Sequence, residues 1–169
     1  MFKARFKSSA TSKYLAERLL TPYQDHFTVC ALRLFFLYGA HPTPKKTLIN
    51  LLIDKIKHNQ SIGLDGENGE GLLFTPTFTR DIARSIEYCL MNNLSGIFNI
   101  ANPNAYSIKQ VADTIAKNLN TQCSFERNRS KKALKIIPSI DKFLRYFPHM
   151  KFTPFEEGIR YCINKLHLT

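Results

Sequence analysis

The stretch FTVCALRLFFLYG, from Phe27 to Gly39, decides the fold that this sequence predicts. Nearly every residue from Phe27 to Leu37 is apolar, and β-branched and aromatic side chains dominate the run. Parallel strands that are buried on both faces have this composition, whereas half-exposed strands alternate apolar and polar residues. The stretch therefore predicts a buried parallel strand, which requires neighbouring strands and helices that cover both faces.

Helical and extended patterns alternate along the rest of the chain. Helices are predicted at residues 8–20, 45–58, 81–91, 108–119, 139–147 and 154–166, and extended segments at 61–64, 72–79 and 96–101. Such alternation is typical of α/β domains with a parallel sheet. Because the 169 residues contain no repeat and no linker, the sequence predicts a single α/β domain over residues 1–169.

Three of these helices carry further signals. The apolar face of the helix at 8–20 is formed by Tyr14, Leu15, Ala16, Leu19 and Leu20. The apolar face of the helix at 81–91 is formed by Ile82, Ala83, Ile86 and Leu90. Asp81 and Ser107 have side chains suited to N-caps, so we expect each to cap the helix that follows it.

Composition narrows the possible functions. The formal net charge is +11, and the densest basic cluster is Arg127, Arg129, Lys131, Lys132 and Lys135, in a predicted loop. Aromatic residues do not interleave with this cluster as on a single-strand stacking platform, so we interpret it as a solvated basic loop rather than as a nucleic-acid site. Attraction for phosphate-bearing small molecules remains open.

Cysteine usage and hydropathy point to an ordinary intracellular domain. The four cysteines form no CxxC pair and no zinc-like Cys/His spacing, which favours reduced core thiols and no metal site. No segment approaches the roughly 18 apolar residues of a membrane span. The first residues do not have the pattern of a signal peptide, so we expect a cytoplasmic protein without a membrane partner.

A glycine-rich turn, GLDGENGEG, occupies residues 63–71. A phosphate cradle would open a helix whose amides face the anion, but this turn leads into the extended segment 72–79. It also carries Asp65, Glu67 and Glu70, which would repel an anion. The sequence therefore predicts a hairpin turn here.

Five segments in order resemble the extended short-chain dehydrogenase/reductase family, the NAD(P)-dependent sugar-nucleotide epimerases and dehydratases. Ser9–Lys13, followed by Ala16 and Glu17, is similar to the family's YxxSKxxxE helix, and LRLFFLYG at 32–39 is similar to its LRxxNxYG strand. The other three are FTPTFTRDIA at 74–83, GIFNIANPNAYS at 96–107 and FEEGI at 155–159. The resemblance covers the carboxy-terminal half of the family.

This resemblance implies a partial Rossmann-like, doubly wound fold with the substrate-binding α/β subdomain but without the amino-terminal dinucleotide-binding half. It implies NAD or NADP as cofactor and a nucleotide sugar as substrate. No strand, GxxGxxG turn and helix occur in succession here, so the pyrophosphate lacks its usual backbone anchor and we expect this chain alone to bind NAD(P) poorly.

The resemblance also assigns candidate site residues. Lys13 matches the family Lys that contacts the nicotinamide ribose, and Ser9 occupies the position of the catalytic Tyr. A serine hydroxyl is far less acidic than a phenol, so Lys13 would not make Ser9 a competent base. Tyr38, in the strand-end motif, is assigned to the cofactor. The YxxxK match at Tyr161–Lys165 lies in the last predicted helix, and we interpret it as coincidental.

Three further positions are assigned to the substrate. Phe36 stands where the family often has an Asn, and Phe74 stands where many members have an Arg that binds phosphate. Arg80 replaces the first carboxylate of the family's VDD pattern. An apolar ring cannot replace a guanidinium that clamps phosphate, so the substrate contacts must differ from the family's.

Three functional hypotheses follow. The first is a truncated or split epimerase/dehydratase-like protein that is the substrate-binding half and is inactive alone, with a homodimer partner or a Rossmann-half chain covering its exposed apolar strand. The second is an enzyme that becomes active when a separate Rossmann chain completes it. The third is a basic binding module that uses the cluster at 127–135.

Overall fold

The computed structural model describes residues 2–40 and 47–166. In chain order its elements are α1 (Phe2–Leu20), η1 (Thr21–Tyr23), β1 (Cys30–Leu34), β2 (Leu37–Tyr38), α2 (Leu48–Lys57), β3 (Ile62–Asp65), β4 (Leu73–Phe74), β5 (Thr77–Phe78), α3 (Thr79–Met91), β6 (Gly96–Ile100), β7 (Tyr106–Ser107), α4 (Ile108–Asn118), β8 (Phe125–Asn128), β9 (Lys135–Ile136), α5 (Asp141–Tyr146) and α6 (Phe155–Leu166). The predicted α/β class is confirmed, and the first residues of the predicted helix at 45–58 lie outside the described part.

The strands pair in small groups rather than in one continuous sheet. β1 pairs in parallel with β6, from Cys30 opposite Gly96 to Leu34 opposite Ile100. β2 pairs in parallel with β5, and β3 pairs in parallel with β8. β4 lies between β7 and β9, antiparallel to the first and parallel to the second. Parallel pairing of strands that are distant in sequence is the topology expected of an α/β fold.

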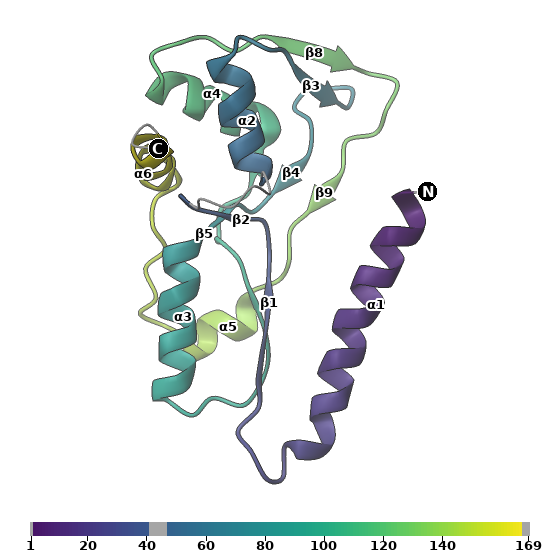
Figure 1. Cartoon of the computed structure of the whole chain (residues 1–169), viewed down its shortest axis with the longest axis vertical. Coiled ribbons are helices and arrows are strands. Elements are labelled where there is room, and N and C mark those ends of the chain that lie inside the picture. The colour runs from purple at the N-terminus through teal and green to yellow at the C-terminus, as the bar shows by residue number, and fades with distance from the viewer. Residues whose placement is uncertain (1, 41–46, 167–169) are drawn as a thin grey trace.

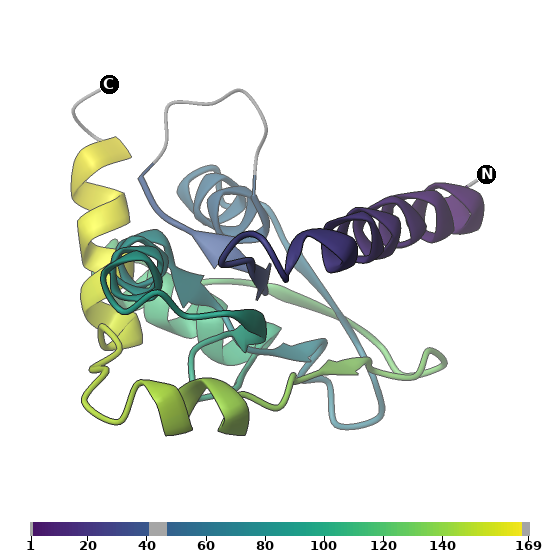
Figure 2. The ribbon, with the colours of Figure 1, turned by 90° about the horizontal axis from the view of Figure 1, so that it is seen from below.

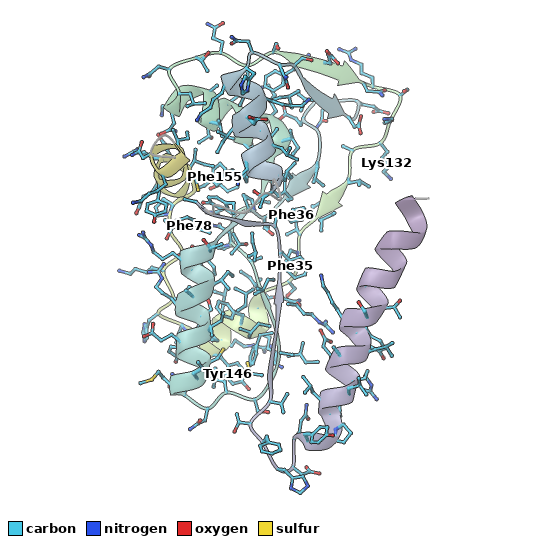
Figure 3. All side chains as sticks on the ribbon, in the orientation of Figure 1. Phe35, Phe36, Phe78, Lys132, Tyr146 and Phe155 are labelled. Atoms are coloured by element: carbon cyan, nitrogen blue, oxygen red, sulfur yellow. The ribbon has the colours of Figure 1, made fainter. Side chains whose placement is uncertain are left out.

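Two apolar clusters hold the body together. In the upper part of Figure 1, α2, α4 and α6 pack around Ile53, Phe74, Val111 and Ile159. In the lower part, α3 and α5 pack on the β1–β6 pair around Phe98, Ile100 and Phe143. The carboxyl ends of β1 and β6 point toward the junction between the two parts, near Phe36 and Phe78 (Figure 3).

The apolar run at 27–37 does not form one strand that is buried on both faces. β1 ends at Leu34, and Arg33 and Leu34 are exposed. Within the described residues β1 pairs with β6 alone, so its other edge has no strand beside it. The predicted burial of this run was therefore wrong. An apolar composition indicates that a strand can be covered on both faces, but the described part of the chain contains no second strand beside β1.

Helix α1 starts earlier than predicted and stands away from the body. Figures 1 and 2 show it extending alongside β1 but diverging from it toward the amino terminus. Its predicted apolar face is exposed: Leu19, for example, exposes 71% of its surface, and Tyr14 and Leu15 each expose more than half. The periodicity identified a helix correctly, but no described element covers that face.

Two other local predictions were wrong. The glycine-rich turn does not close a hairpin, because β3 pairs with β8 while β4 pairs with β7 and β9. The buried face of α3 consists of Asp81, Ile82, Ser85 and Cys89, so Ala83, Ile86 and Leu90 lie on the exposed side. By contrast, Ser107 caps α4 as predicted, with a reciprocal capping box to Gln110.

Candidate functional site

Phe36 and Phe74, two of the predicted substrate residues, lie in contact. The chain turns at Phe36, whose φ of +43° is in the left-handed region that disfavours large side chains. The Phe36 and Phe74 ring centroids are 4.8 Å apart, and the Thr77 amide donates to the Phe36 carbonyl at 3.1 Å. A tilted ring contact and a hydrogen bond therefore hold a strained backbone at the carboxyl end of β1. Phe74 itself is fully buried and has no surface for a substrate.

Beside this turn, buried polar groups join the connection between β4 and β5 to the residues that follow β6. The Thr77 hydroxyl accepts from the Asn102 amide at 3.0 Å and donates to the Thr75 carbonyl at 3.2 Å. The Thr75 hydroxyl is also buried and has no hydrogen-bond partner in the described part of the chain. We call Phe36, Phe74, Thr75, Thr77 and Asn102 the carboxyl-edge cluster. Open α/β sheets bind ligands at this edge.

A cavity of about 560 Å³ borders the cluster on the side of β6. Asn102, Pro103 and Asn104 line one wall, and the segment from Phe152 to Glu156 lines another. Its lining combines aromatic surface with amide and hydroxyl groups, which is the usual composition of a small-molecule site. The carboxyl-edge cluster and this cavity form the candidate functional site.

Tyr38, which the resemblance assigned to the cofactor, is part of the core. Its side chain exposes 1% of its surface and packs between Phe78 and Phe155. Burial raises the pKa of its hydroxyl far above the ordinary value. A buried phenol of this kind can neither contact a dinucleotide nor act as a base, so the assignment fails in this structure.

Arg80 is exposed and lies over two aromatic rings. Its guanidinium carbon is 5.6 Å from the centre of the Phe78 ring and 4.9 Å from that of Tyr161. This stacking orients a cation at the start of α3 while leaving it accessible to solvent. Arg80 can therefore bind an anion, and Tyr161, from the YxxxK match, acts as its platform rather than as an acid or base.

Asp81 is not the N-cap of α3 but lies inside its first turn, and Phe78 precedes the helix in the cap position. The carboxylate is fully buried and accepts from the Thr153 amide at 3.0 Å, from the Thr153 hydroxyl at 2.7 Å and from Arg84. These bonds tie α3 to the segment before α6. Sequence reasoning missed this role because Thr153 is distant along the chain.

Lys13 lies on α1, apart from the aromatic site residues, and the side chain of Ser9 lies outside the described part. One turn after Lys13, the Glu17 carboxylate accepts two hydrogen bonds from Arg33 of β1. Lys13 shares that face of α1 and lies about 6 Å further along the helix axis. Since α1 runs opposite to β1 in Figure 1, this displacement is toward the carboxyl end of β1.

The basic cluster is more structured than predicted. Arg127 belongs to β8, and Arg127, Arg129 and Lys131 line an open groove of about 620 Å³ together with Asp65 and Glu126. Lys132 follows on the connection to β9 (Figure 3). The two carboxylates offset part of the positive charge, and the remaining positive charge can attract phosphate groups.

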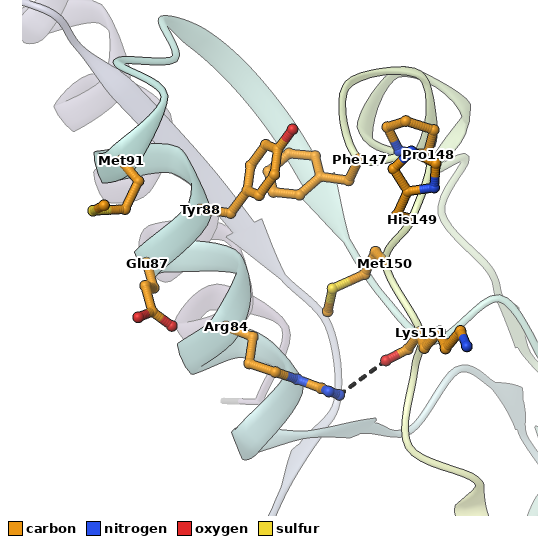
Figure 4. A pocket seen from close by; sticks show the side chains of 9 residues that line it. All are labelled: Arg84, Glu87, Tyr88, Met91, Phe147, Pro148, His149, Met150 and Lys151. Atoms are coloured by element: carbon orange, nitrogen blue, oxygen red, sulfur yellow. Dashed lines mark hydrogen bonds between the residues drawn. The ribbon is translucent and has the colours of Figure 1, made fainter.

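A further groove of about 520 Å³ lies between α3 and the segment after α5 (Figure 4). The Tyr88 and Phe147 rings form its wall with centroids 4.4 Å apart, and Arg84 donates to the Lys151 carbonyl at 2.9 Å at one end. None of the site residues predicted from sequence lines it. Its residues follow no motif that could have revealed it.

Among the described residues no three His, Cys, Asp or Glu side chains cluster as metal ligands. In the same part of the chain, no helix combines the length and apolar character needed to cross a bilayer.

Solved structures of known proteins show which fold this chain has. No family model matches the sequence. The structure is similar to UDP-glucose 4-epimerase of Thermus thermophilus in complex with NAD, with a TM-score of 0.72 and 18% identity over 89% of this chain and 51% of that one. It is also similar to dTDP-glucose 4,6-dehydratase of Bacillus anthracis in complex with NAD, with a TM-score of 0.71 and 19% identity over 89% of this chain and 48% of that one.

A third similar structure is UDP-glucuronic acid 4-epimerase of Bacillus cereus, with a TM-score of 0.72 and 17% identity over 90% of this chain and 50% of that one. The chain thus spans about half the length of each of these enzymes. Identities this low establish the fold alone. The chain has the partial Rossmann-like fold of about half of an NAD-dependent epimerase or dehydratase of the extended short-chain dehydrogenase/reductase type.

Proposed function

We propose that this chain is the substrate-binding half of an epimerase/dehydratase-like protein and does not catalyse a reaction by itself. The observation that carries the proposal is the free edge of β1: a strand of core composition has one neighbour, β6, within the described residues. A second segment, in the same polypeptide or another, supplies the missing strands and the dinucleotide site. Exposed strand edges of this kind otherwise promote association.

The residues present do not fit NAD or NADP. The glycine-rich turn at 63–71 leads into β4 rather than into a helix, so no helix N-terminus faces a pyrophosphate there. Tyr38 is buried, and Ser9 offers a hydroxyl that is a poor base in place of a phenol. Lys13 keeps the position of the family Lys, and its role in binding the ribose depends on the complementary half.

The substrate proposed for the carboxyl-edge cluster and its cavity is a nucleotide sugar. The enzymes of similar fold are named for UDP-glucose, dTDP-glucose and UDP-glucuronic acid. In this chain Arg80 supplies the cation for the phosphates, and the half-buried Phe36 supplies apolar contact in place of the family Asn. The fully buried Phe74 supports Phe36 from behind rather than touching the ligand.

Titration with UDP-glucose tests this assignment. Chemical shifts in the ¹⁵N spectrum should change at Phe36, Thr77 and Asn102, and Arg80→Gln should weaken binding about tenfold, the loss expected for one charge-assisted hydrogen bond. Arg145→Gln, at an exposed position of α5, is the matched control and should bind like the wild type. Equal binding by Arg80→Gln would contradict the role of Arg80, and shifts confined to another surface would contradict the site.

The partner of this half is proposed to be a Rossmann-half segment or, in its absence, a second copy of the chain. The exposed apolar residues of α1 and the free edge of β1 lie on adjoining elements. Burying about 1,000 Å² of such surface is worth at most about 25 kcal/mol before entropy is counted. The chain alone should therefore self-associate in light scattering, whereas a monomer that unfolds cooperatively would count against the proposal.

Completion of this chain by a Rossmann-half segment into an active enzyme is the alternative within the same class. Mixing the chain with such a segment and NAD should then give turnover of a nucleotide sugar. Ser9 stands where the family has its catalytic Tyr. This argues against an active completed enzyme, since no described residue supplies the missing phenol. Turnover that survives Lys13→Met would show that the family mechanism is not in use.

The groove lined by Arg127, Arg129 and Lys131 favours a second candidate, a basic binding module. Binding of a polyanion there would fall steeply with salt, with a slope set by the number of phosphates contacted. Titration of single-stranded RNA at several salt concentrations tests it. Arg129→Gln should lower the slope by about one if the groove binds phosphates, and an unchanged slope would exclude the groove.

A further inference from the structure

Two of the four cysteines come together away from the candidate functional site. Cys30 is the first residue of β1, and Cys89 lies in the last turn of α3. Cys89 is buried in the apolar cluster that contains Phe98 and Ile100, and the half-buried Cys30 packs against the same cluster. In the β1–β6 pair Cys30 lies opposite Gly96, which closes the turn that follows α3. Two thiols from distant parts of the sequence therefore share one apolar cluster and influence each other.

Backbone hydrogen bonds hold the segments that carry the two cysteines together. The Leu94 amide donates to the Cys89 carbonyl at 3.0 Å, which ties the end of α3 to the following turn. At the other end of that turn, the Gly96 amide donates to the carbonyl of Val29 at 2.9 Å, and the Ser95 hydroxyl donates to the same carbonyl at 3.2 Å. Since Val29 precedes Cys30, the turn connects both cysteines. Figure 1 shows the end of α3 and the start of β1 at the same end of the molecule.

The two thiols differ in how they can react. Burial, together with the neighbouring Cys30 thiol, raises the pKa of the Cys89 thiol to about 12, so it is protonated at neutral pH. Cys30 is partly exposed and is therefore the thiol that a dissolved oxidant reaches first. Neither remaining cysteine has this arrangement: Cys123 contacts Asp113 at 3.4 Å, and Cys162 is buried in the other apolar cluster.

We propose that Cys30 and Cys89 form an oxidative modification site at which hydrogen peroxide joins β1 to α3 through a disulfide. The Cys30 thiolate attacks the peroxide O–O bond, giving a sulfenic acid and hydroxide. The Cys89 sulfur then attacks the sulfenic sulfur, and the proton of its thiol leaves with the hydroxyl group as water. Overall, two thiols and one hydrogen peroxide give one disulfide and two waters.

The disulfide would stabilise the part of the fold that lacks a neighbouring strand. It closes a long loop that contains β2 to β5 and most of α3, and long loops gain most from cross-linking because the unfolded chain loses more freedom. The oxidised chain should therefore melt about 5–10 °C above the reduced chain. β1 would then be anchored to the body even when its free edge is unpaired.

Peptide mapping of the whole chain tests the proposal. The chain is treated with a small excess of hydrogen peroxide under native conditions, unfolded, alkylated with N-ethylmaleimide, and digested without reductant. The expected product is two hydrogens lighter before alkylation, carries alkyl groups on Cys123 and Cys162, and yields one linked peptide pair containing Cys30 and Cys89. Dithiothreitol should restore alkylation of all four cysteines.

Matched variants separate the proposed pair from general oxidation. Cys162→Ser and Cys123→Ser should still form the linked peptide at the wild-type rate. Cys89→Ala, which keeps the buried position apolar, should stop at a dimedone-reactive sulfenic acid on Cys30. A stable sulfenic acid on Cys30 in the wild type, or linkage of Cys30 to any cysteine other than the Cys89 of its own chain, would overturn the proposal.

Discussion

Arg33 in β1 donates two hydrogen bonds to the Glu17 carboxylate in α1, from Nε to Oε1 at 2.8 Å and from Nη2 to Oε2 at 2.6 Å. This bidentate pair connects the protruding helix to the strand with the free edge. Both side chains are accessible to solvent, so the pair positions α1 more than it stabilises the fold.

Glu17→Gln should therefore release α1 without unfolding the body. Hydrogen exchange measured by mass spectrometry should become faster in peptides covering residues 10–20 and stay unchanged in those covering α4. Asp113→Asn removes another exposed ion pair, with Lys109, and is the control that should leave α1 unaffected. Unchanged exchange in α1 after Glu17→Gln would mean that other contacts hold the helix.

The same pair predicts a pH dependence. The hydrogen bond from Arg33 lowers the pKa of Glu17 below its ordinary value of 4.5. A carboxyl whose pKa is lower in the folded state stabilises that state above its unfolded pKa, and this contribution disappears as pH falls through the folded pKa. Carboxyl ¹³C titration should give a midpoint below 4.5 that rises in Arg33→Gln. Equal midpoints in the two proteins would show that the pair does not form in solution.

Substitutions at Tyr38 and at Gly158 should change the free energy of unfolding in opposite directions. A Cβ added at Gly158 would overlap the Tyr38 hydroxyl and lie 3.0 Å from its Cζ, so Gly158→Ala should lower the free energy of unfolding by about 1–3 kcal/mol. Tyr38→Phe removes a buried hydroxyl that has no partner among the described residues, and should raise that free energy by about 1 kcal/mol.

Urea denaturation measures both changes and their coupling. Tyr38→Phe should reduce the cost of Gly158→Ala in the double variant, because the closest clashing atom is gone. Gly63→Ala is the control, since a Cβ there meets no atom within 4 Å, and it should cost nothing. A loss of stability in Tyr38→Phe would show that the hydroxyl has a hydrogen-bond partner in solution.

Asp81→Ala should cost more than any surface substitution in α3. The buried carboxylate receives bonds from Thr153 and Arg84, and removing it leaves the Thr153 amide without its acceptor. A decrease of about 2–4 kcal/mol in the free energy of unfolding is expected. Exchange should also become faster in residues 151–155. Glu87→Ala, on the exposed side of the same helix, should change stability by less than about 0.5 kcal/mol.

The sequence was informative wherever local chemistry decides the structure. The apolar run at 96–101 is β6, and Ser107 begins α4 with the hydrogen bonds that its side chain and that of Gln110 predict. Extended backbone at 72–79 and the last helix were also placed closely. These features depend on neighbouring residues, so a pattern of a few positions is enough to find them.

Long-range contacts explain the failures. Asp81 was read as a cap because the residue that binds it, Thr153, is far along the chain. Tyr38 was assigned by motif to a cofactor, but Gly158 of α6 leaves room for its ring in the core. The basic cluster was read as a loop because charged residues mask the extended pairing of β8 with β3. The free edge of β1 follows from which strands lie beside it among the described residues. Those neighbours come from distant parts of the sequence, so a local pattern cannot predict them.

Isothermal titration of this chain with NAD⁺ and NADH tests whether the chain has a dinucleotide site of its own. We expect no heat of binding for either dinucleotide up to millimolar concentration, because the described part of the chain has no helix N-terminus that follows a glycine-rich turn to hold the pyrophosphate. Addition of a complementary Rossmann-half segment should then create a site with a dissociation constant in the micromolar range. Stoichiometric micromolar binding of NAD⁺ by this chain alone would show that it holds a complete dinucleotide site and is not only a substrate-binding half.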